Sequence, residues 1–184
     1  MGPALFSGPN RNVHPEPSRH LLRIRLPGPL RHDFGFRYFE PMLKITKTDY
    51  DALRHHGEET YPHECCGVLL GRFGDDIHTV TSAVRCGNTR DDSPHNRYNI
   101  DPRELVKIQS EGRKRGEDIV GFYHSHPDHP AQWSPTDLAD AHWIGCSYVI
   151  TRVAKGKADA TNSFKLSGMD ENDKKFSDEK IEVS

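Results

Sequence analysis

His124 and His126 are separated by one residue, and Asp137 follows a short distance later. Alternate side chains of an extended segment point to the same side, so the two imidazoles can reach one point. Pro127 then ends the extended segment. A helix that begins at Ser134 would place Asp137 in its first turn, where the carboxylate can face the imidazoles. Two imidazoles and one carboxylate leave a coordination position of Zn²⁺ open, which is typical of catalytic rather than structural zinc.

The charge of such a site favours hydrolytic chemistry. Two neutral imidazoles and one carboxylate leave a Zn²⁺ site with a positive charge, and protein zinc sites of this type lower the pKa of bound water to about 7. A further carboxylate must then take the proton and pass it to the leaving group. We therefore predict one zinc ion per chain.

Other interpretations of the same residues stay open. Ser134, Pro135 and Asp137 also form an ordinary helix start, with an N-cap, a proline in the first turn and a capping-box acid. His129, in the linking loop, is an alternative to Asp137 as third ligand. Two histidines and a carboxylate also describe the ligands of a non-haem Fe(II) enzyme, although that class usually orders its ligands as HxD or HxE with a distant histidine.

The chain resembles the JAMM (MPN-plus) metalloproteases. The residues that carry the upstream part of the resemblance follow the pattern P-x-E-x-C-G-x-L-x-G, and are Pro62, Glu64, Cys66, Gly67, Leu69 and Gly71. The HxHP and SxxD parts of the family signature match at His124, His126, Pro127, Ser134 and Asp137. The resemblance covers essentially the whole chain after Met42. It implies a cytidine-deaminase-like JAB/MPN domain, in which a single mixed β-sheet or half-barrel is sandwiched by helices.

The resemblance also implies a role for each site residue. His124, His126 and Asp137 would bind the zinc, and Glu64 would act as general acid/base through the zinc-bound water. Ser134 would donate a hydrogen bond to the oxyanion. The implied reaction is hydrolysis of an amide or isopeptide bond at the C-terminus of a ubiquitin-like protein.

The length of the chain narrows the substrate class. With 47 residues after Asp137, the chain looks too short for the insertions with which eukaryotic relatives grip ubiquitin chains. It is more similar to the compact bacterial stand-alone members, which process ubiquitin-like sulfur-carrier proteins. A non-catalytic MPN scaffold is the alternative, but all five catalytic positions keep the expected residue types.

The elements that must position these residues alternate along the chain. We expect helices over residues 49–60, 101–116 and 134–144, and strands over 66–70, 77–84, 118–123, 147–153, 162–166 and 180–183. The second helix has the clearest boundaries, since Asp101, Pro102 and Glu104 open it and basic residues precede Gly116 at its end. Interleaved strands and helices indicate an α/β or α+β class, with a mixed sheet and flanking helices.

The first 41 residues differ in composition from the rest. They hold seven of the 13 prolines, six arginines and no lysine. Prolines at this density break helices and strands, so we expect an unpacked extension over 1–41 and the metalloprotease domain over 42–184. Translation that starts at Met42 and a basic tether are two further interpretations.

Composition excludes several classes of protein. The chain has 184 residues and a formal net charge of -2, which suits one domain. Without a long apolar run or a signal-peptide core, we expect a cytoplasmic protein with no membrane partner. Without a basic block, we expect no nucleic-acid partner. The four cysteines lack CxxC spacing and are expected to be small buried thiols without chemistry; they are Cys65, Cys66, Cys86 and Cys146.

Overall fold

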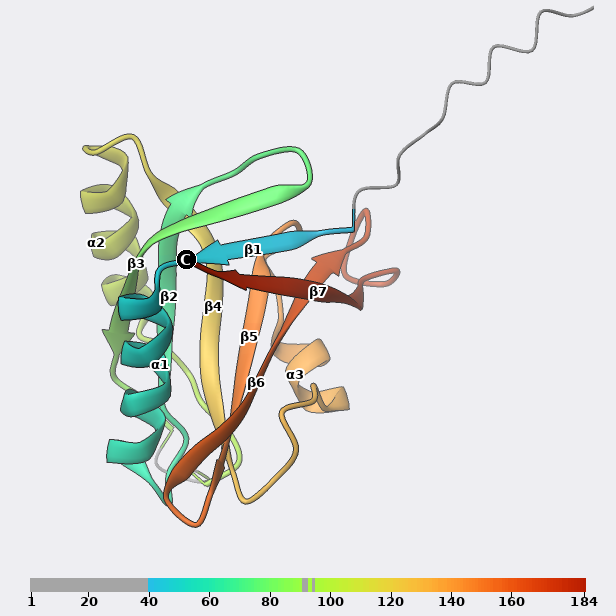
Figure 1. Ribbon diagram of the computed structural model, residues 1–184. Coiled ribbons are helices and arrows are strands. Elements are labelled where there is room, and N and C mark those ends of the chain that lie inside the picture. The colour runs from blue at the N-terminus through green and yellow to red at the C-terminus, as the bar shows by residue number, and fades with distance from the viewer. Residues whose placement is uncertain (1–39, 91–92, 94) are drawn as a thin grey trace, which may run out of the picture. The chain divides into compact units, whose positions relative to one another are not determined.

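The computed structural model describes residues 40–90, 93 and 95–184. Within these residues the strands are β1 (Met42–Ile45), β2 (Cys66–Arg72), β3 (Ile77–Cys86), β4 (Asp118–Pro127), β5 (Ser147–Ala154), β6 (Lys157–Ser167) and β7 (Lys175–Val183). The helices are α1 (Lys47–Thr60), α2 (Pro102–Arg113) and α3 (Pro135–Asp140). Figure 1 shows their arrangement.

The strands form one closed sheet in the order β1-β3-β2-β4-β5-β6-β7. β1 closes it by running parallel to two neighbours at once, with Met42 beside Ile77 of β3 and beside Lys180 of β7. The predicted α/β class and mixed sheet are confirmed. The predicted single mixed sheet or half-barrel is a closed barrel in the structure, because β1 makes a hydrogen-bonded ladder along both of its edges and joins β3 to β7.

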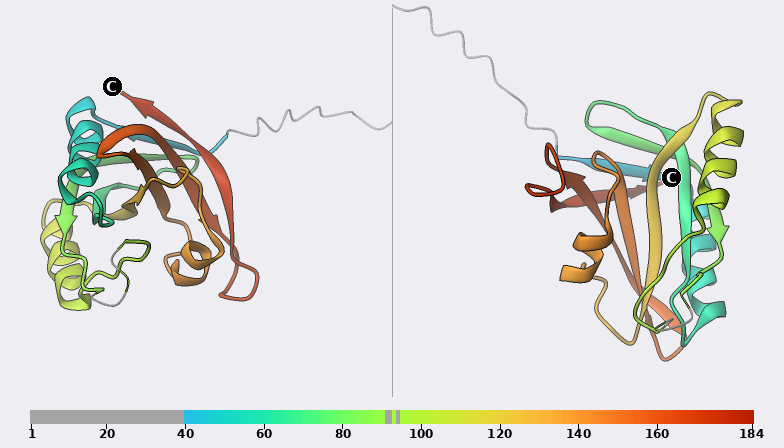
Figure 2. Two further views of the ribbon diagram at one scale, coloured as in Figure 1. Left: turned by 90° about the horizontal axis from the view of Figure 1, so that it is seen from below. Right: turned by 180° about the vertical axis from the view of Figure 1, so that it is seen from behind.

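Helices pack on both faces of the sheet (Figure 2). Leu53 of α1 packs with Leu43, Val120 and Tyr123 in one buried cluster. Ile108 of α2 belongs to a second cluster, which includes Phe122 and Tyr148 and against which Leu138 of α3 and Trp143 pack. Because successive residues of a strand face opposite sides, Phe122 and Tyr123 of β4 contribute to different clusters. The predicted covering of the sheet by helices on both faces is therefore present.

β4 is the strand from which the site is built. It pairs antiparallel with β2 and parallel with β5. Parallel neighbours need a crossover, and α3 lies within it. Gly67 of β2 shows how closely these strands and side chains pack, since a Cβ at Gly67 would lie 2.2 Å from the ring of Tyr123. Glycine is therefore required at position 67 because the ring of Tyr123 packs against its backbone, and not only because the position lies near a strand end.

Several predicted element boundaries differ from the structure: β1 is not predicted, β4 continues to Pro127, and β6 begins at Lys157 and not at residue 162. Two further differences lie at α3 and at the C-terminal strand. α3 ends at Asp140 and not at residue 144, because Ala141 has an extended backbone (φ -82°, ψ 110°). The Lys174 ammonium donates to the carbonyls of Ala139 and Ala141, which satisfies acceptors at this helix end. The C-terminal strand, predicted over 180–183, begins at Lys175, because its first part pairs with β6.

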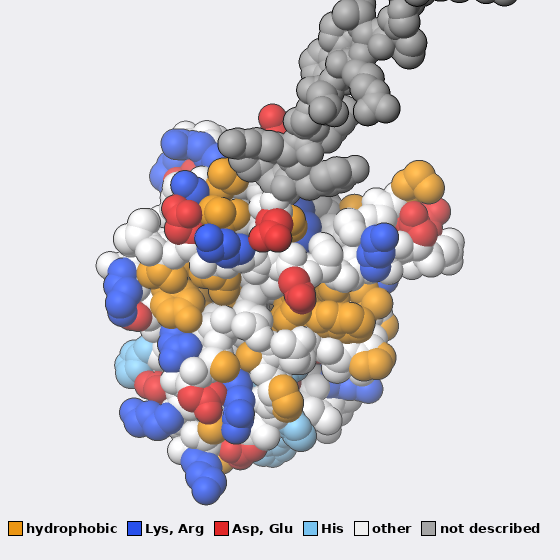
Figure 3. Space-filling view, turned by 45° about the vertical axis from the view of Figure 1, so that its right-hand side comes forward, with side chains coloured by type: hydrophobic (Ala, Val, Ile, Leu, Met, Phe, Trp, Pro, Cys, Tyr) orange, Lys and Arg blue, Asp and Glu red, His pale blue; other side chains and the backbone are white. Residues whose placement is uncertain are grey.

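Other expectations concern the surface and the termini. Of the predicted extension, all but Glu40 and Pro41 lies outside the described residues, so the division at residue 41 stays a prediction. None of the helices in the described part of the chain is long and apolar enough to cross a bilayer. Acidic and basic side chains are interspersed on the face in Figure 3. The four cysteines are buried free thiols, as expected.

Candidate metal centre

The two histidines of the HxHP motif lie within β4. His124 and His126 have the same alternation as Phe122, so they face the side of the sheet that α2 and α3 cover. His124 is paired in register with Cys66 of β2 and with Ile150 of β5. Strands on both sides therefore hold the backbone of the motif.

The ligand atoms of three side chains converge, as their spacing predicts. His124, His126 and Asp137 each offer one ligand atom, and these atoms lie within 4.8 Å of one another. The Nε2 atoms of the two histidines are 3.0 Å apart. Asp137 Oδ1 lies 3.3 Å from His124 Nε2, and its Oδ2 lies 3.6 Å from His126 Nε2.

These separations fit a zinc ion. Ligand atoms at about 2.0–2.1 Å from a tetrahedral centre are about 3.3 Å from one another. The separation of 3.0 Å between the two Nε2 atoms and the separations of 3.3 and 3.6 Å from these atoms to the two different oxygens of Asp137 lie around this value. Three protein ligands around such a centre leave the fourth corner open, as in a catalytic zinc site.

The rings of the two histidines are held in different ways. His126 Nδ1 lies 2.9 Å from the carbonyl oxygen of Pro130, which only accepts, so Nδ1 carries the proton and Nε2 has a free lone pair. The ring of His124 stacks on Tyr98 with a centroid distance of 4.7 Å. Within the described residues, the buried Nδ1 of His124 has no hydrogen-bond partner. Packing therefore orients His124, whereas a hydrogen bond orients His126.

Asp137 caps a helix and faces the histidines at the same time. Ser134 Oγ accepts from the Asp137 N–H at 3.1 Å, and the Ser134 N–H donates to Asp137 Oδ2 at 2.6 Å. Burial alone would raise the pKa of Asp137, but the bonds to His124, His126 and Ser134 hold that pKa well below its usual range. The carboxylate is thus charged and fixed in direction.

Glu64 lies two residues before β2, and its side chain lies near His126 and Asp137. The Cys65 N–H donates to Ser125 Oγ at 2.9 Å, and the Ser125 N–H donates to the Cys65 carbonyl at 3.2 Å. These bonds join the segment after Glu64 to the middle of the HxH motif. Glu64 is 5% exposed, and burial raises the pKa of its carboxyl to about 8.

A pocket of about 380 Å³, which we call the metal-site pocket, lies over these residues. Glu64, His126, Ser134 and Asp137 line it, and His129 forms part of its wall. His129 is not part of the converging group, which contains Asp137 as its third member. The cavity leaves room for a substrate bond beside the open corner.

Sequence reasoning missed three residues that hold the site. Ser125 fastens Glu64's segment, the Pro130 carbonyl orients His126, and Tyr98 stacks on His124. Ser125 lies inside the HxHP motif and Pro130 three residues after it, so their closeness in sequence to the two histidines could have indicated these contacts. Tyr98 belongs to a loop far from the motif in the sequence, and nothing local indicates its contact.

Comparison with known proteins identifies the class to which this fold and site belong. Residues 46–167 match the family described as prokaryotic homologs of the JAB domain. The chain therefore belongs to the prokaryotic JAB family, which confirms the JAMM resemblance noted in the sequence.

Two relatives are enzymes by name. The chain is 43% identical over 112 residues to the desampylase of Haloferax volcanii, covering 59% of this chain and 78% of the relative. It is 39% identical over 106 residues to a Thermus thermophilus protein named "Probable TtuB-protein conjugate cleaving protease", covering 58% of this chain and 68% of that protein. The expectation of a hydrolytic enzyme is thereby confirmed.

Solved structures share the fold. The solution structure of a Desulfitobacterium hafniense protein superposes with a TM-score of 0.64 at 28% identity, covering 78% of this chain and 94% of that chain. A Salinibacter ruber protein gives a TM-score of 0.56 at 34% identity, over 77% of this chain and 92% of the other.

Proposed function

We propose that this protein is a zinc-dependent hydrolase of an amide or isopeptide bond at the C-terminus of a ubiquitin-like or sulfur-carrier protein. The observation that carries the proposal is the convergence of His124, His126 and Asp137 beside the buried Glu64 in one pocket. A cytoplasmic location stays a prediction from the sequence.

His124, His126 and Asp137 would hold the zinc. When bound there, zinc supplies a Lewis acid that polarises the scissile carbonyl and acidifies a water molecule. The three side chains are held by Pro130, Tyr98 and the first turn of α3. Preorganised ligands of this kind favour one coordination geometry.

Glu64 and Ser134 would act on the substrate. Glu64 lines the metal-site pocket, and a cation held beside it would favour the ionised carboxylate over the neutral form that burial favours. The carboxylate can then take a proton from the attacking water and deliver it to the departing amine. The Ser134 oxygen already accepts from the Asp137 N–H, but a hydroxyl can accept and donate at once. Its proton can therefore serve the oxyanion that develops on the scissile carbonyl.

The names of the relatives support the substrate class. One is a desampylase, and the other is named for cleaving conjugates between TtuB and protein. Both names describe separation of one protein from another molecule rather than digestion of a protein chain.

The test is incubation with ubiquitin-like carriers from the same genome that bear C-terminal extensions, with products measured by intact mass. We expect one cleavage immediately after the carrier's Gly-Gly. Glu64→Gln keeps the ligand set but removes proton transfer, so it should retain zinc and lose about 10²–10⁴-fold in rate. Cleavage inside the folded carrier, or undiminished turnover by Glu64→Gln at equal zinc content, would contradict the proposal.

A further inference from the structure

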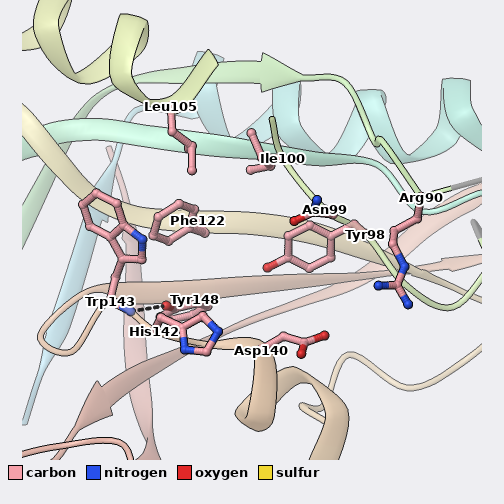
Figure 4. Close-up of a pocket in the computed structure, with 10 residues that line it drawn as sticks. All are labelled: Arg90, Tyr98, Asn99, Ile100, Leu105, Phe122, Asp140, His142, Trp143 and Tyr148. Carbon is pink, nitrogen blue, oxygen red and sulfur yellow. Dashed lines mark hydrogen bonds between the residues drawn. The ribbon is translucent and has the colours of Figure 1, made fainter. Parts of the chain in front are cut away.

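A second pocket lies next to Tyr98, whose ring stacks on His124, and it shares no lining residue with the metal-site pocket. Its volume is about 240 Å³, and we call it the aromatic pocket (Figure 4). The apolar and aromatic side chains that line it are Tyr98, Ile100, Leu105, Phe122, Trp143 and Tyr148, and the polar side chains that complete the lining are Arg90, Asn99, Asp140 and His142. Apart from Tyr98, which packs on His124, none of them has a role in the proposed chemistry.

The aromatic pocket is built from the same elements as the metal centre. Phe122 lies two residues before His124 on the same face of β4. Tyr98 lines the pocket and also stacks on the His124 ring. Asp140, at its rim, ends the helix whose first turn carries Asp137. A ligand in this pocket would therefore lie beside the reacting bond.

The walls of the pocket are held by contacts with one another. Phe122 and Tyr148, each 5% exposed, lie at its buried end. The Tyr148 hydroxyl accepts from the Trp143 N–H at 3.1 Å, and the rings of Phe122 and Trp143 meet edge to face at 5.4 Å. Figure 4 shows the Tyr98 hydroxyl directed into the space between these rings. Fixed aromatic walls favour an apolar occupant.

The size of the pocket limits what can occupy it. Sites for whole small molecules usually measure about 300–1,000 Å³. The aromatic pocket, at about 240 Å³, is below that range and suits one large side chain.

The position of Glu64 assigns the pocket to one side of the scissile bond. Glu64 and Ser134 line the metal-site pocket, so the amine that receives Glu64's proton leaves on that side. The acyl part of the substrate would then extend the opposite way, toward Phe122. An extended acyl part that runs alongside β4 would cover about 7 Å in two residues, the same rise as from His124 to Phe122. The side chain that reaches the pocket is therefore the third one before the scissile bond.

We infer that the aromatic pocket binds a large apolar side chain of the substrate at the third position before the scissile bond and selects for it. This inference rests on the proposed hydrolysis, since it assigns a specificity element to the same site. The contacts are apolar packing against Phe122, Leu105 and Trp143.

The test uses carriers with a C-terminal extension that differ only at this third position, with Leu, Phe, Ala or Asp. We expect kcat/KM to be at least about tenfold higher for Leu or Phe than for Ala, as for other apolar specificity pockets. Leu105→Trp fills the pocket and should bring this ratio to within twofold of one. Val106→Trp is the matched control, because Val106 is the next residue of α2 and is 68% exposed; it should keep the wild-type ratio.

A second measurement does not depend on turnover. Trp133 and Trp143 are the two tryptophans of the chain, so Trp133→Phe makes Trp143 the sole reporter. In a Trp133→Phe, Glu64→Gln variant, titration with the Leu or Phe carrier should shift Trp143 emission, and titration with the Ala carrier should not. This readout also serves if Leu105→Trp fails to fold.

Two results would overturn the inference: equal kcat/KM for all four carriers, or a preference that Leu105→Trp leaves unchanged. If wild type cleaves none of the carriers, the proposed hydrolysis fails, and the Trp143 titration still decides whether the pocket binds the side chain.

Discussion

At the scale of single residues, Asp137 both caps α3 and faces the histidines. The sequence supports each of these two interpretations separately. Its Oδ2 accepts the Ser134 N–H, and its Oδ1 lies 3.3 Å from His124 Nε2. A carboxylate has two oxygens and several lone pairs, so capping a helix does not prevent it from binding a cation. The cap fixes the direction in which the candidate ligand points.

His124 should be essential for metal binding. We expect about one zinc per chain in the purified protein and a zinc content near zero in His124→Ala, because two remaining ligands hold zinc poorly. Elemental analysis by mass spectrometry measures this content. His142→Ala is the control, since the His142 side chain is 63% exposed and lies outside the converging group; it should keep its zinc. Full zinc retention in His124→Ala would remove His124 from the ligand set.

At the scale of elements, the stability of α3 depends on the residues that cap its ends. It has six residues, none of them buried, so its caps hold it more than its packing does. Ser134→Ala should lower the free energy of unfolding by about 0.5–2 kcal/mol, whereas Ser134→Gly should lower it by only a few tenths. Denaturant titration measures both.

The same pair of variants separates the two roles of Ser134. Both lack the hydroxyl, so both should lose about 10²–10³-fold in hydrolysis if that hydroxyl donates to the oxyanion. If the rate of Ser134→Gly stays near wild type while that of Ser134→Ala falls, Ser134 is a cap alone.

α1 carries a buried histidine that should make stability depend on pH. His56 is 8% exposed and its Nδ1 lies 3.0 Å from the Tyr123 hydroxyl. Burial, reinforced by Arg85, lowers the pKa of His56 to about 4. The unfolded chain binds this proton below about pH 6.5 and the folded chain does not, so stability is complete above pH 6.5 and declines toward pH 4.

We expect His56 to contribute a loss of about 2 kcal/mol in the free energy of unfolding between pH 7 and pH 5. His56→Gln should remove this part of the pH dependence, as measured by denaturant titration at several pH values. His55→Gln is the control, because its side chain is 62% exposed and its ion pairs are at the surface. An unchanged pH profile in His56→Gln would show that His56 does not couple folding to pH.

At the scale of the whole molecule, the shortest strand closes the barrel. Leu43 is fully buried and Ile45 is 2% exposed, and β1 holds β3 and β7 together. Removal of β1 would leave two unpaired strand edges and open one hydrophobic cluster. The stability of the barrel therefore depends on residues that directly follow the proline-rich segment.

Two truncations test this dependence. Among the residues that the structure describes, deletion of 1–41 removes the backbone bond from the Lys180 N–H to the Pro41 carbonyl, and we expect Tm to fall by no more than about 4 °C. Deletion of residues 1–45 removes Leu43 and Ile45, each worth about 2–5 kcal/mol, and should prevent folding of a domain stable by about 5–15 kcal/mol. Thermal unfolding and soluble yield measure both. A folded product of the longer deletion would refute the role of β1.

The sequence by itself determined the parts of the protein that local rules control. Period-two spacing placed His124 and His126 on one face of a strand, and capping signals located the start of α2 at Asp101 and of α3 at Ser134. These signals are readable because each depends on backbone geometry within a few residues.

Only the tertiary structure decided what brings distant segments together. The closure of the barrel by β1, the bond from Ser125 to Cys65 and the stacking of Tyr98 on His124 join segments far apart in sequence. The aromatic pocket likewise combines residues from α2, β4, β5 and two loops. Such contacts follow from the packing of the complete chain, because a short strand or a loop aromatic has no local preference that specifies its partner.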